Sequence, residues 1–281
     1  MKRMIALLLV ICLLLLAGCG TAEKAGEEKK SETPAEETPI LLAIGNADVP
    51  VGDYTLKIFE YYGIDAEAIA PHLTYGSNVK EVTTAVVEGT VDCGIIYQTD
   101  AYSAGLTPVD FATPEMCGQV IYPAAVLKDA PNAEAAAHFL AFLRGENSSA
   151  IFSNVGFTPL APEAYAADAS ADSGEVIVFA AASLKESLQK IALTYTEAAP
   201  NVKLTFTFDS SGTLKTQIEE GAVCDLFISA APKQMNALAE KELIAADTRL
   251  DLLENQVCLC VASNSKCGIT SFDALAEKLK K

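Results

Sequence analysis

The stretch VIVFAAASLKESLQKIA, residues 176–192, contains the pattern on which the fold assignment depends. Its first part, 176–182, is apolar throughout, which is typical of a β-strand covered on both faces of a sheet. The residues that follow place Leu184, Leu188 and Ile191 at helical spacing, so they predict an amphipathic helix directly after the strand. A strand that turns at once into a helix is the repeating unit of α/β proteins, and this stretch therefore predicts that class.

The same alternation extends along most of the chain. Further apolar runs predict strands: LLAIGN (41–46), CGIIY (93–97), KLTFTF (203–208), DLFISAA (225–231) and NQVCLCVA (255–262). Amphipathic segments lie between these runs. The pattern predicts an α/β architecture with doubly wound sheets, in which most strands are parallel and buried.

Composition excludes several classes of function. The 281 residues carry 37 acidic against 20 basic side chains, a formal net charge of −17, which leaves no basic face for a nucleic acid. A hydrophobic fraction of 51% is too high for a disordered chain. The length allows one large domain or two modest ones. Two histidines leave little for imidazole catalysis or a histidine-rich metal site.

The N-terminal residues are typical of an export signal. Lys2 and Arg3 precede an apolar run over residues 5–16, which is shorter than the roughly 20 residues of a membrane span. The run ends in Leu-Ala-Gly-Cys at 16–19, which resembles the lipobox of bacterial lipoproteins. We expect a signal peptide over 1–18 and an acylated Cys19; the alternative is an ordinary signal with an incidental cysteine.

The residues after Cys19 contain nothing that a core could bury. GTAEKAGEEKKSETPAEETP, residues 20–39, has no large apolar side chain and is rich in Glu and Lys. Such a composition is typical of a solvated tether, so we expect 19–39 to link a lipid anchor to a folded body. This places the protein outside the cytoplasm, in a periplasm or on the outer face of the cytoplasmic membrane.

The remaining cysteines show no metal-binding spacing, because no CxxC pair occurs. They are Cys12, Cys93, Cys117, Cys224, Cys258, Cys260 and Cys267. Buried small hydrophobic residues are the favoured interpretation. An exported protein can also form disulfides, and the sequence leaves that alternative open.

Four predicted strand-to-helix turns could hold an anion. Ser183–Glu186 and Asn78–Glu81 have the capping-box pattern, in which Ser183 would cap its helix and Glu186 would reach back to it. The turns at 209–213 and 49–52 also open helices. Each turn alone is explained as a capped helix. Together, in an exported chain, they favour an oxyanion site built from helix N-termini and serine hydroxyls.

Longer blocks of the sequence resemble one family. The blocks VIVFAAASLKESLQKIA (176–192), FDSSGTLKTQIEEGAVCDLFISAAPKQM (208–235) and LLENQVCLCVASNSK (252–266) closely resemble the N-terminal half of bacterial periplasmic molybdate-binding proteins. Blocks over 41–64, 78–101 and 121–160 resemble the C-terminal half of those proteins. Together the two groups cover nearly all of residues 40–281.

The two groups occur in the reverse of the family's order. Each half appears once, so the resemblance indicates a circular permutation and not a duplication. The small, polar segment 161–174 would join the family's original termini. Permutation is tolerated where the old termini lie close together and the new cut falls in a surface connection. A rearranged gene with a poorly folding product is the alternative, and the intact pattern of both halves argues against it.

The resemblance implies a two-lobed, type II periplasmic-binding-protein-like fold with a ligand cleft between the lobes. Carried onto this sequence, one lobe comprises 104–255. The other lobe combines 40–103 with 256–281.

The resemblance also implies five hydrogen-bond donors to the anion. Ser183 and Ser211 would donate from hydroxyl and backbone N–H groups, Tyr97 from its phenol, and Val51 and Val79 from backbone N–H groups at helix starts. The family commonly has Ala where Val51 stands, which changes little if only the amide is used. No side chain would coordinate the metal directly, and no cofactor is implied. The carboxylate of Asp209 must point away from the ligand or bind a helix N–H itself.

We therefore expect a monomeric solute-binding lipoprotein that captures molybdate or tungstate and delivers it to the permease of an ABC importer. Another tetrahedral oxyanion such as sulfate, or an organic acid, is the nearest alternative. A serine-dependent hydrolase is a second alternative, but neither Ser183 nor Ser211 stands in a GxSxG motif, and neither His72 nor His138 has an evident partner. A surface adhesin is a third, which would leave the four turns unexplained.

Overall fold

The computed structural model describes residues 39–165 and 172–281. The expected signal peptide, Cys19 and nearly all of the expected tether lie outside the described residues, as do residues 166–171 of the expected linker. None of the helices in the described ranges combines the length and the apolarity needed to cross a membrane.

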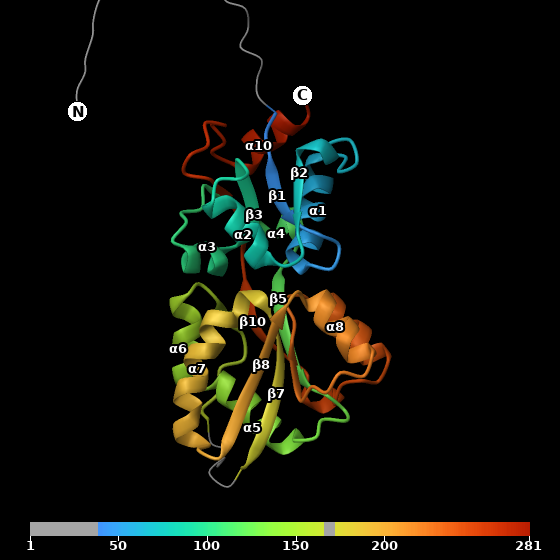
Figure 1. Cartoon of the computed structure of the whole chain (residues 1–281), viewed down its shortest axis with the longest axis vertical. Coiled ribbons are helices and arrows are strands. Elements are labelled where there is room, and N and C mark those ends of the chain that lie inside the picture. Colours follow the sequence, from blue (N-terminus) through green and yellow to red (C-terminus); the bar gives the residue numbers. More distant parts are fainter. Residues whose placement is uncertain (1–38, 166–171) are drawn as a thin grey trace, which may run out of the picture. The chain divides into compact units, whose positions relative to one another are not determined.

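The body contains two sheets, each covered by helices, which we call the first and the second lobe (Figure 1). The first sheet has the order β2-β1-β3-β11-β4. Its strands are β1 (Leu42–Gly45), β2 (Leu73–Gly76), β3 (Cys93–Tyr97), β4 (Asp110–Phe111) and β11 (Val257–Val261). The helices of this lobe are α1 (Pro50–Tyr62), η1 (Ala70–His72), α2 (Val79–Val87), α3 (Gln98–Ala104), α4 (Pro114–Cys117) and α10 (Phe272–Leu279).

The second sheet has the order β6-β10-β5-β9-β7-β8. Its strands are β5 (Val120–Val126), β6 (Thr158–Pro159), β7 (Gly174–Ala181), β8 (Val202–Asp209), β9 (Leu226–Ile228) and β10 (Leu250–Asn255). The helices of this lobe are α5 (Ala133–Arg144), α6 (Glu146–Asn154), η2 (Ala182–Leu184), α7 (Lys185–Ala198), α8 (Ser211–Glu219), α9 (Pro232–Glu240) and η3 (Ala246–Thr248). In Figure 1, α6 and α7 lie on one side of this sheet and α8 on the other.

The chain passes between the lobes twice. It leaves the first lobe between α4 and β5, and it returns at Gln256, between β10 and β11. The short strand β4 lies within 104–255, the range expected for the second lobe, yet it pairs with β11 in the first sheet. The first crossing therefore comes after residue 111, because β4 completes the edge of the first sheet before the chain leaves it.

All six predicted strands are present, but the expectation of largely parallel sheets is only partly correct. β1, β2 and β3 are parallel, as are β7, β8 and β9. In contrast, β11 runs antiparallel to β3, and β5 antiparallel to β9. Each of these two strands enters its sheet from the other lobe and runs in the direction opposite to the three parallel strands of that sheet. Both are nonetheless buried, which is why β11 is apolar throughout.

A continuous hydrophobic core spans both lobes, and a smaller cluster around Leu214, Phe227 and Met235 lies under α8 and α9. The cysteines contribute to this packing. All six within the described residues are free thiols; five are buried and Cys267 is partly buried. Burial raises the pKa of the Cys117 thiol to about 11, despite the nearby Lys57. Their interpretation as small hydrophobic residues is confirmed for this part of the chain.

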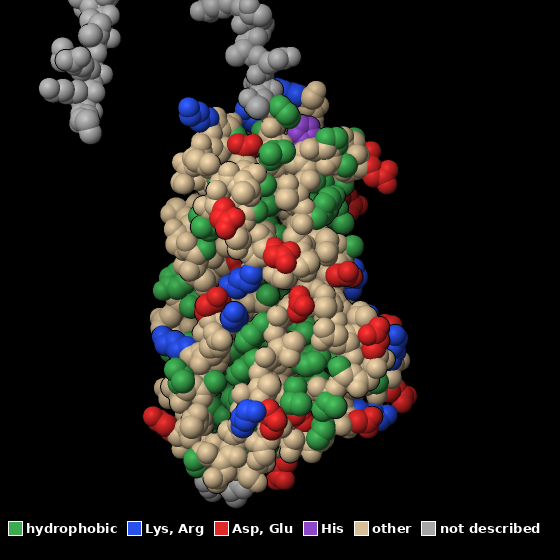
Figure 2. Space-filling model, in the orientation of Figure 1, with side chains coloured by type: hydrophobic (Ala, Val, Ile, Leu, Met, Phe, Trp, Pro, Cys, Tyr) green, Lys and Arg blue, Asp and Glu red, His purple; other side chains and the backbone are tan. Residues whose placement is uncertain are grey.

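On the face shown in Figure 2, acidic and basic side chains are interspersed, and hydrophobic side chains gather over β7 and β8 of the second lobe. On the outer strand β8, Phe206 and Phe208 are only half-buried and stack on one another at 5.3 Å between ring centroids.

Candidate functional site

A small cavity, about 10 Å³ in volume, lies where six strand-to-helix turns meet, three from each lobe. The turns follow β1, β2 and β3 in the first lobe and β7, β8 and β9 in the second. The residues that line it are Val49, Pro50, Val79, Tyr97, Ala181, Ala182, Ser183, Asp209, Ser210, Ser211 and Ala230. A cavity of this volume has room for about one water molecule.

The first lobe offers helix starts and one phenol. At the start of α2, the Asn78 side chain accepts the N–H groups of Lys80 (3.0 Å) and Glu81 (3.2 Å). The predicted cap at Asn78 is thus confirmed, and it uses the amides of the two residues after Val79, which is one of the residues that line the cavity. α1 begins with Pro50, which has no N–H to leave unsatisfied.

Tyr97 is the last residue of β3 and has only 1% of its surface exposed. Its hydroxyl makes no hydrogen bond to any described residue. The ring is held by edge contacts with Tyr54 and Tyr122, at centroid distances of 6.5 and 5.9 Å. Burial raises the pKa of Tyr97 well above its ordinary value, so the group stays protonated. The result is a buried O–H donor at the cavity, and such a donor costs free energy until it meets an acceptor.

Ser183 does not cap a helix, so that prediction is wrong. It lies inside the 3₁₀ turn η2, and α7 begins only at Lys185. Its Oγ is 2.9 Å from the hydroxyl of Tyr122. Glu186, expected to reach back to this turn, instead forms an ion pair with Lys80 at 2.8 Å. The buried Tyr122 hydroxyl and the cross-lobe Lys80 have displaced the local capping box.

The turn after β8 provides the second serine. Ser210 caps α8 by accepting the N–H of Thr213 (3.0 Å), whereas Ser211 is the first helical residue and is completely buried. The Ser211 Oγ accepts the N–H of Ala230 (2.9 Å), which follows β9. The Asp209 carboxylate accepts the N–H of Ser210 (2.7 Å), so it binds a backbone amide near the start of the helix.

The structure thus brings Ser183, Ser211, Val79 and Tyr97 to one cavity. Val51 is fully buried in the first turn of α1, but it is not one of the described residues that line the cavity. Val49 and Pro50 occupy the lining there, because α1 begins at Pro50 and turns the next residue toward the core.

The lobes contact one another beside this cavity. The N–H of Gly212 donates to the carbonyl of Asp48 (3.0 Å), which joins the turn after β8 to the turn after β1. A Cβ atom on Gly212 would lie 2.3 Å from that carbonyl oxygen, so the close approach requires glycine. Lys233 also pairs with Asp53 across the lobes at 2.8 Å. These contacts describe a closed arrangement.

A buried carboxylate lies behind the first lobe's turns. Asp100, in the first turn of α3, is completely buried and is 3.1 Å from the ammonium of Lys80. Burial raises the pKa of Asp100 to about 6, although Lys80 opposes this shift. Lys80 is therefore shared between Asp100 in its own lobe and Glu186 in the other.

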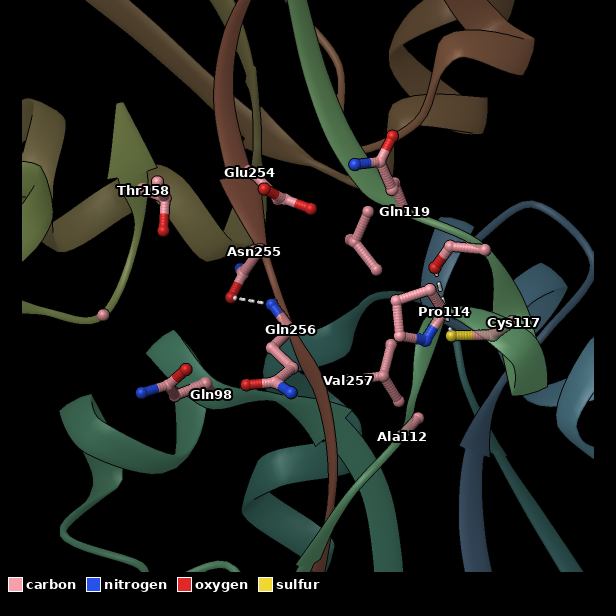
Figure 3. Close-up of a pocket in the computed structure, with 13 residues that line it drawn as sticks. Gln98, Ala112, Pro114, Cys117, Gln119, Thr158, Glu254, Asn255, Gln256 and Val257 are labelled. Atoms are coloured by element: carbon pink, nitrogen blue, oxygen red, sulfur yellow. Dashed lines mark hydrogen bonds between the residues drawn. The ribbon is translucent and has the colours of Figure 1, made fainter. Parts of the chain in front are cut away.

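A larger pocket of about 240 Å³ lies at the two crossings between the lobes (Figure 3). It is lined by carboxamides such as Gln98, Gln119 and Gln256, and also by the carboxylate of Glu254. None of the sequence-predicted site residues lines it. The smaller cavity also has a carboxylate in its lining, Asp209, but this group accepts the N–H of Ser210. The smaller cavity is the better candidate for an oxyanion because serine hydroxyls and helix starts meet there.

Neither serine has the surroundings of a nucleophile. Ser183 bonds to Tyr122 and Ser211 to Ala230, and neither bonds to a histidine within the described residues. His138, for which the sequence showed no partner, pairs with Asp172 at 2.7 Å. The described residues also include no group of three or more His, Cys, Asp or Glu side chains that could hold a metal ion.

A family of bacterial extracellular solute-binding proteins matches this chain over residues 34–158 and 176–281. The chain belongs to this family. Its members are extracellular solute-binding proteins and not enzymes, so the hydrolase alternative falls away.

Relatives of named function match part of the chain. The molybdate-binding protein ModA of Haemophilus influenzae is 42% identical over 37% of this chain and 40% of its own length. ModA of Escherichia coli is 46% identical over 34% of this chain and 36% of its own length. YvgL of Bacillus subtilis, named as an ABC transporter substrate-binding lipoprotein, is 35% identical over 37% of this chain and 40% of its own length. The chain thus spans about two fifths of the length of the curated relatives it matches.

Solved structures bear on the fold. A phosphate-binding protein of an ABC transporter from Streptococcus pneumoniae covers 85% of this chain and 94% of its own, with a TM-score of 0.53 and 15% identity. The likeness confirms the two-lobed type II periplasmic-binding-protein fold, with two mixed sheets.

Sequence reasoning missed three residues around the cavity. Ala230 lines it and donates to Ser211, Tyr122 contacts Ser183, and Asp100 holds Lys80. The predicted strand ending at Ala231 could have pointed to Ala230, because the ends of neighbouring parallel strands meet at one edge of a sheet. Tyr122 is 61 residues from its partner, and no local pattern indicates that contact.

Proposed function

We propose that this solute-binding protein captures molybdate or tungstate between its lobes and delivers the anion to the permease of an ABC importer. The observation that carries the proposal is the convergence of Ser183, Ser211 and Tyr97 hydroxyls with the start of α2 on one cavity. The identity of the partial relatives as molybdate-binding proteins supports the choice of anion. Val51 stays in the proposal as an amide donor one residue beyond the lining.

The chemistry of the lining suits a fully deprotonated tetrahedral dianion. Such an anion offers only acceptors, and hydroxyls and helix N-termini offer donors. Of the described residues that line the cavity, none is Lys, Arg or His. Neutral donors in a buried site can hold an anion because helix dipoles and local hydrogen bonds act there with little screening.

Selectivity among dianions has to come from size. Sulfate has the same charge as molybdate but is smaller, so the closed lobes must not shrink far enough to satisfy it. Tungstate is nearly the same size as molybdate and should bind as well. The cavity of about 10 Å³ is smaller than either metal oxyanion, so the turns must move apart slightly when the anion is held between them.

We also propose that the chain is a circular permutant of the molybdate-binding family. The family match leaves out residues 159–175, which include the segment 161–174 expected to join the original termini. Each curated relative aligns with only about a third of the chain, as a sequential alignment would if the halves stood in reversed order. The lobe limits of 40–103 with 256–281 and 104–255 remain part of this proposal, with the first crossing placed after β4.

The proposed location is extracytoplasmic, with acylated Cys19 as the membrane anchor and residues 19–39 as the tether. The named lipoprotein YvgL among the partial relatives supports an anchor of this kind. We further propose that the protein acts as a monomer.

Calorimetric titration of the purified chain tests the proposed function. Molybdate and tungstate should bind with similar affinity, and sulfate and hydrogen phosphate at least about a hundredfold more weakly, a difference of roughly 2.7 kcal/mol. Ser183→Ala and Ser211→Ala should each cost about 1.5–3 kcal/mol of binding free energy, the value of one charge-assisted hydrogen bond.

The control variant is Ser148→Ala. Ser148 is 1% exposed and its hydroxyl has no hydrogen-bond partner in the described structure, but it lies on α6, away from the cavity. Its affinity for molybdate should equal that of the unmodified chain. Equal affinity for sulfate and molybdate, or unchanged binding in both cavity-serine variants, would refute the proposal.

A further inference from the structure

Resting on the proposed function, we propose that Tyr122 and Asn255 are positioning residues that make Ser183 a hydrogen-bond donor toward the cavity. Neither of them lines the cavity. They form a hydrogen-bonded chain from the crossing between the lobes to the Ser183 hydroxyl, and the direction of each hydrogen in this chain follows from its neighbours.

The direction is set at Asn255, the last residue of β10 and 6% exposed. The backbone N–H of Gln256 lies 2.8 Å from one terminal atom of the Asn255 side chain. A backbone N–H can only donate, so this atom must be the carbonyl oxygen. The other terminal atom is therefore the NH₂ nitrogen, which donates to Thr99 (2.9 Å) and to Tyr122 (3.1 Å).

The orientation of Asn255 determines the orientation of the Tyr122 hydroxyl. The Tyr122 side chain is fully buried in β5, and its hydroxyl accepts a hydrogen from Asn255. The other group in hydrogen-bond geometry with this hydroxyl is the Ser183 Oγ, at 2.9 Å, whereas the neighbouring Tyr97 hydroxyl lacks that geometry. A phenol has a single hydrogen, and Asn255 can supply a hydrogen but cannot accept one at its nitrogen. If Ser183 donated instead, the buried Tyr122 hydrogen would have no acceptor in hydrogen-bond geometry, so we assign the Tyr122 hydrogen to Ser183.

Ser183 consequently accepts from Tyr122 and retains its own hydrogen. That hydrogen points away from Tyr122, and the side chain lines the cavity. Ser211 is in the same situation, because its Oγ accepts the N–H of Ala230. Both serines thus receive a hydrogen bond from the protein and have one to give, which is the arrangement that favours an anion without hydrogens.

The chain of hydrogen bonds also joins the two lobes. Asn255 lies at the second crossing, and its NH₂ group contacts Thr99 on α3 of the first lobe and Tyr122 of the second. The direction of the Ser183 hydroxyl is therefore tied to the closed arrangement. An oxyanion that carries a hydrogen needs an acceptor, and this arrangement offers it a donor at Ser183.

The first test is the ratio of two affinities in Tyr122→Phe. The phenylalanine leaves Ser183 free to donate or to accept, so molybdate affinity should fall by about threefold or less, while hydrogen phosphate affinity should rise by about tenfold. The ratio of molybdate to phosphate affinity therefore falls. A parallel loss for both anions, with an unchanged ratio, would overturn the proposal, because a merely structural role predicts that result.

The second test is a double-mutant cycle with Asn255→Asp. A carboxylate at 255 accepts from Tyr122, so Tyr122 would accept from Ser183 and the cavity would lose its donor. Molybdate affinity should fall by about tenfold or more in the unmodified chain, but by less than about threefold in the Tyr122→Phe background. Equal losses in both backgrounds would show that the added charge acts without the relay and would overturn the proposal.

Tyr195→Phe is the matched control for the tyrosine variant. Tyr195 is 1% exposed, is in the second lobe and packs against Phe139 and Phe142, away from the cavity. Its affinity ratio should equal that of the unmodified chain. Circular dichroism and a thermal melt confirm that each variant is folded.

A readout without ligand separates this proposal from the proposed function. Neutron diffraction on the unliganded, deuterium-exchanged protein should show the Tyr122 deuterium on the line to Ser183 Oγ. A deuterium on Ser183 that points at Tyr122 would overturn the relay even if molybdate binds. If none of the four anions binds but the Tyr122 deuterium points at Ser183, the proposed function fails and the relay stands.

Discussion

The two lobes have sheets of the same strand order. The first reads β2-β1-β3-β11-β4, and the second reads β8-β7-β9-β5-β10 with β6 added at the edge. In both lobes the first three strands of the lobe are parallel, the fourth position is taken by an antiparallel strand arriving from the other lobe, and the next strand leads to the crossing. The three turns that each lobe sends to the cavity therefore occupy corresponding places.

The lobes differ in the chemistry of those turns. The first lobe contributes helix starts with apolar residues and the unpaired phenol of Tyr97. The second contributes Ser183 and Ser211, whose hydroxyls already accept hydrogen bonds from the protein. The comparison shows that the topology determines where hydrogen-bond donors converge. The residues at the turns determine whether a donor is unpaired or is already hydrogen-bonded to the protein.

The shared order also bears on the proposed permutation. A chain that starts in either lobe completes three strands, adds an edge strand, crosses, and repeats the same course. Exchanging the order of the lobes therefore preserves the arrangement of the sheets.

The largest effect is expected from separating the lobes at Gly212. In Gly212→Ala, the added methyl would meet the Asp48 carbonyl at 2.3 Å, so the lobes could not close fully. Molybdate affinity should fall by about a hundredfold, because the donors of the first lobe no longer reach the anion. Calorimetry measures the affinity, and small-angle scattering should show a larger radius of gyration.

The melting temperature of the unliganded Gly212→Ala variant controls for folding. Gly212 lies in α8, where alanine is a better helix former than glycine by about 1 kcal/mol, so the second lobe should not lose stability. Full molybdate affinity in this variant would mean that closure at this contact is not needed for binding.

Removing one hydroxyl from each lobe, in Tyr97→Phe and Ser211→Ala, tests the difference between the lobes through the stability of the unliganded protein. Tyr97→Phe removes an unpaired buried hydroxyl, so the unliganded protein should keep or gain stability. Ser211→Ala strands the N–H of Ala230, so the unliganded protein should lose about 1–3 kcal/mol. Urea denaturation measures the free energies of unfolding, and calorimetry should show weaker molybdate binding in both variants. Equal destabilisation of both would contradict the assigned pairing of the hydroxyls.

The smallest effect is expected for the pH dependence of stability. It concerns the third residue of two corresponding helices, α3 in the first lobe and α9 in the second. This residue is Asp100 in α3 of the first lobe and the neutral Gln234 in α9 of the second, and both are buried. Burial raises the folded-state pKa of Asp100 from 3.8 to about 6, so the folded state holds this proton more tightly than the unfolded state does. The resulting stability is present below about pH 4 and is lost as the pH rises to about 6.

Asp100→Asn makes the lobes alike at this position. Between pH 4 and 6 the free energy of unfolding of the unmodified chain should fall relative to this variant, by on the order of 1–3 kcal/mol. Urea denaturation at a series of pH values measures the difference. A constant difference across this range would show that the Asp100 pKa is not raised, with Lys80 fully offsetting the burial.

Much of the fold followed from local patterns. Apolar runs such as 176–182 and 257–261 predicted strands, and Asn78 predicted a cap, because these features depend on neighbours within a few residues. The missed strands β5 and β10 contain Pro123 or alternate with polar residues, and they owe their place to pairing with each other. Parallel or antiparallel direction was equally hidden, because it depends on which lobe a strand comes from.

The candidate site was less predictable for the same reason. Ser183, Ser211, Val79 and Tyr97 were named from the resemblance and lie together, whereas Val51 lies in the first turn of α1, next to the residues that line the cavity. The capping role given to Ser183 was wrong because Tyr122, distant in sequence, competes for its hydroxyl. Contacts of this kind follow from the assembled lobes and not from any window of residues.

The tight fit of the six turns has a kinetic consequence. In this closed arrangement the cavity has space for about one water molecule, so the proposed oxyanion could enter it only if the lobes part. The residence time of the cargo is then governed by how often the lobes part. A membrane partner that pulls the lobes apart would speed release of the anion without contacting any of its hydrogen-bond donors.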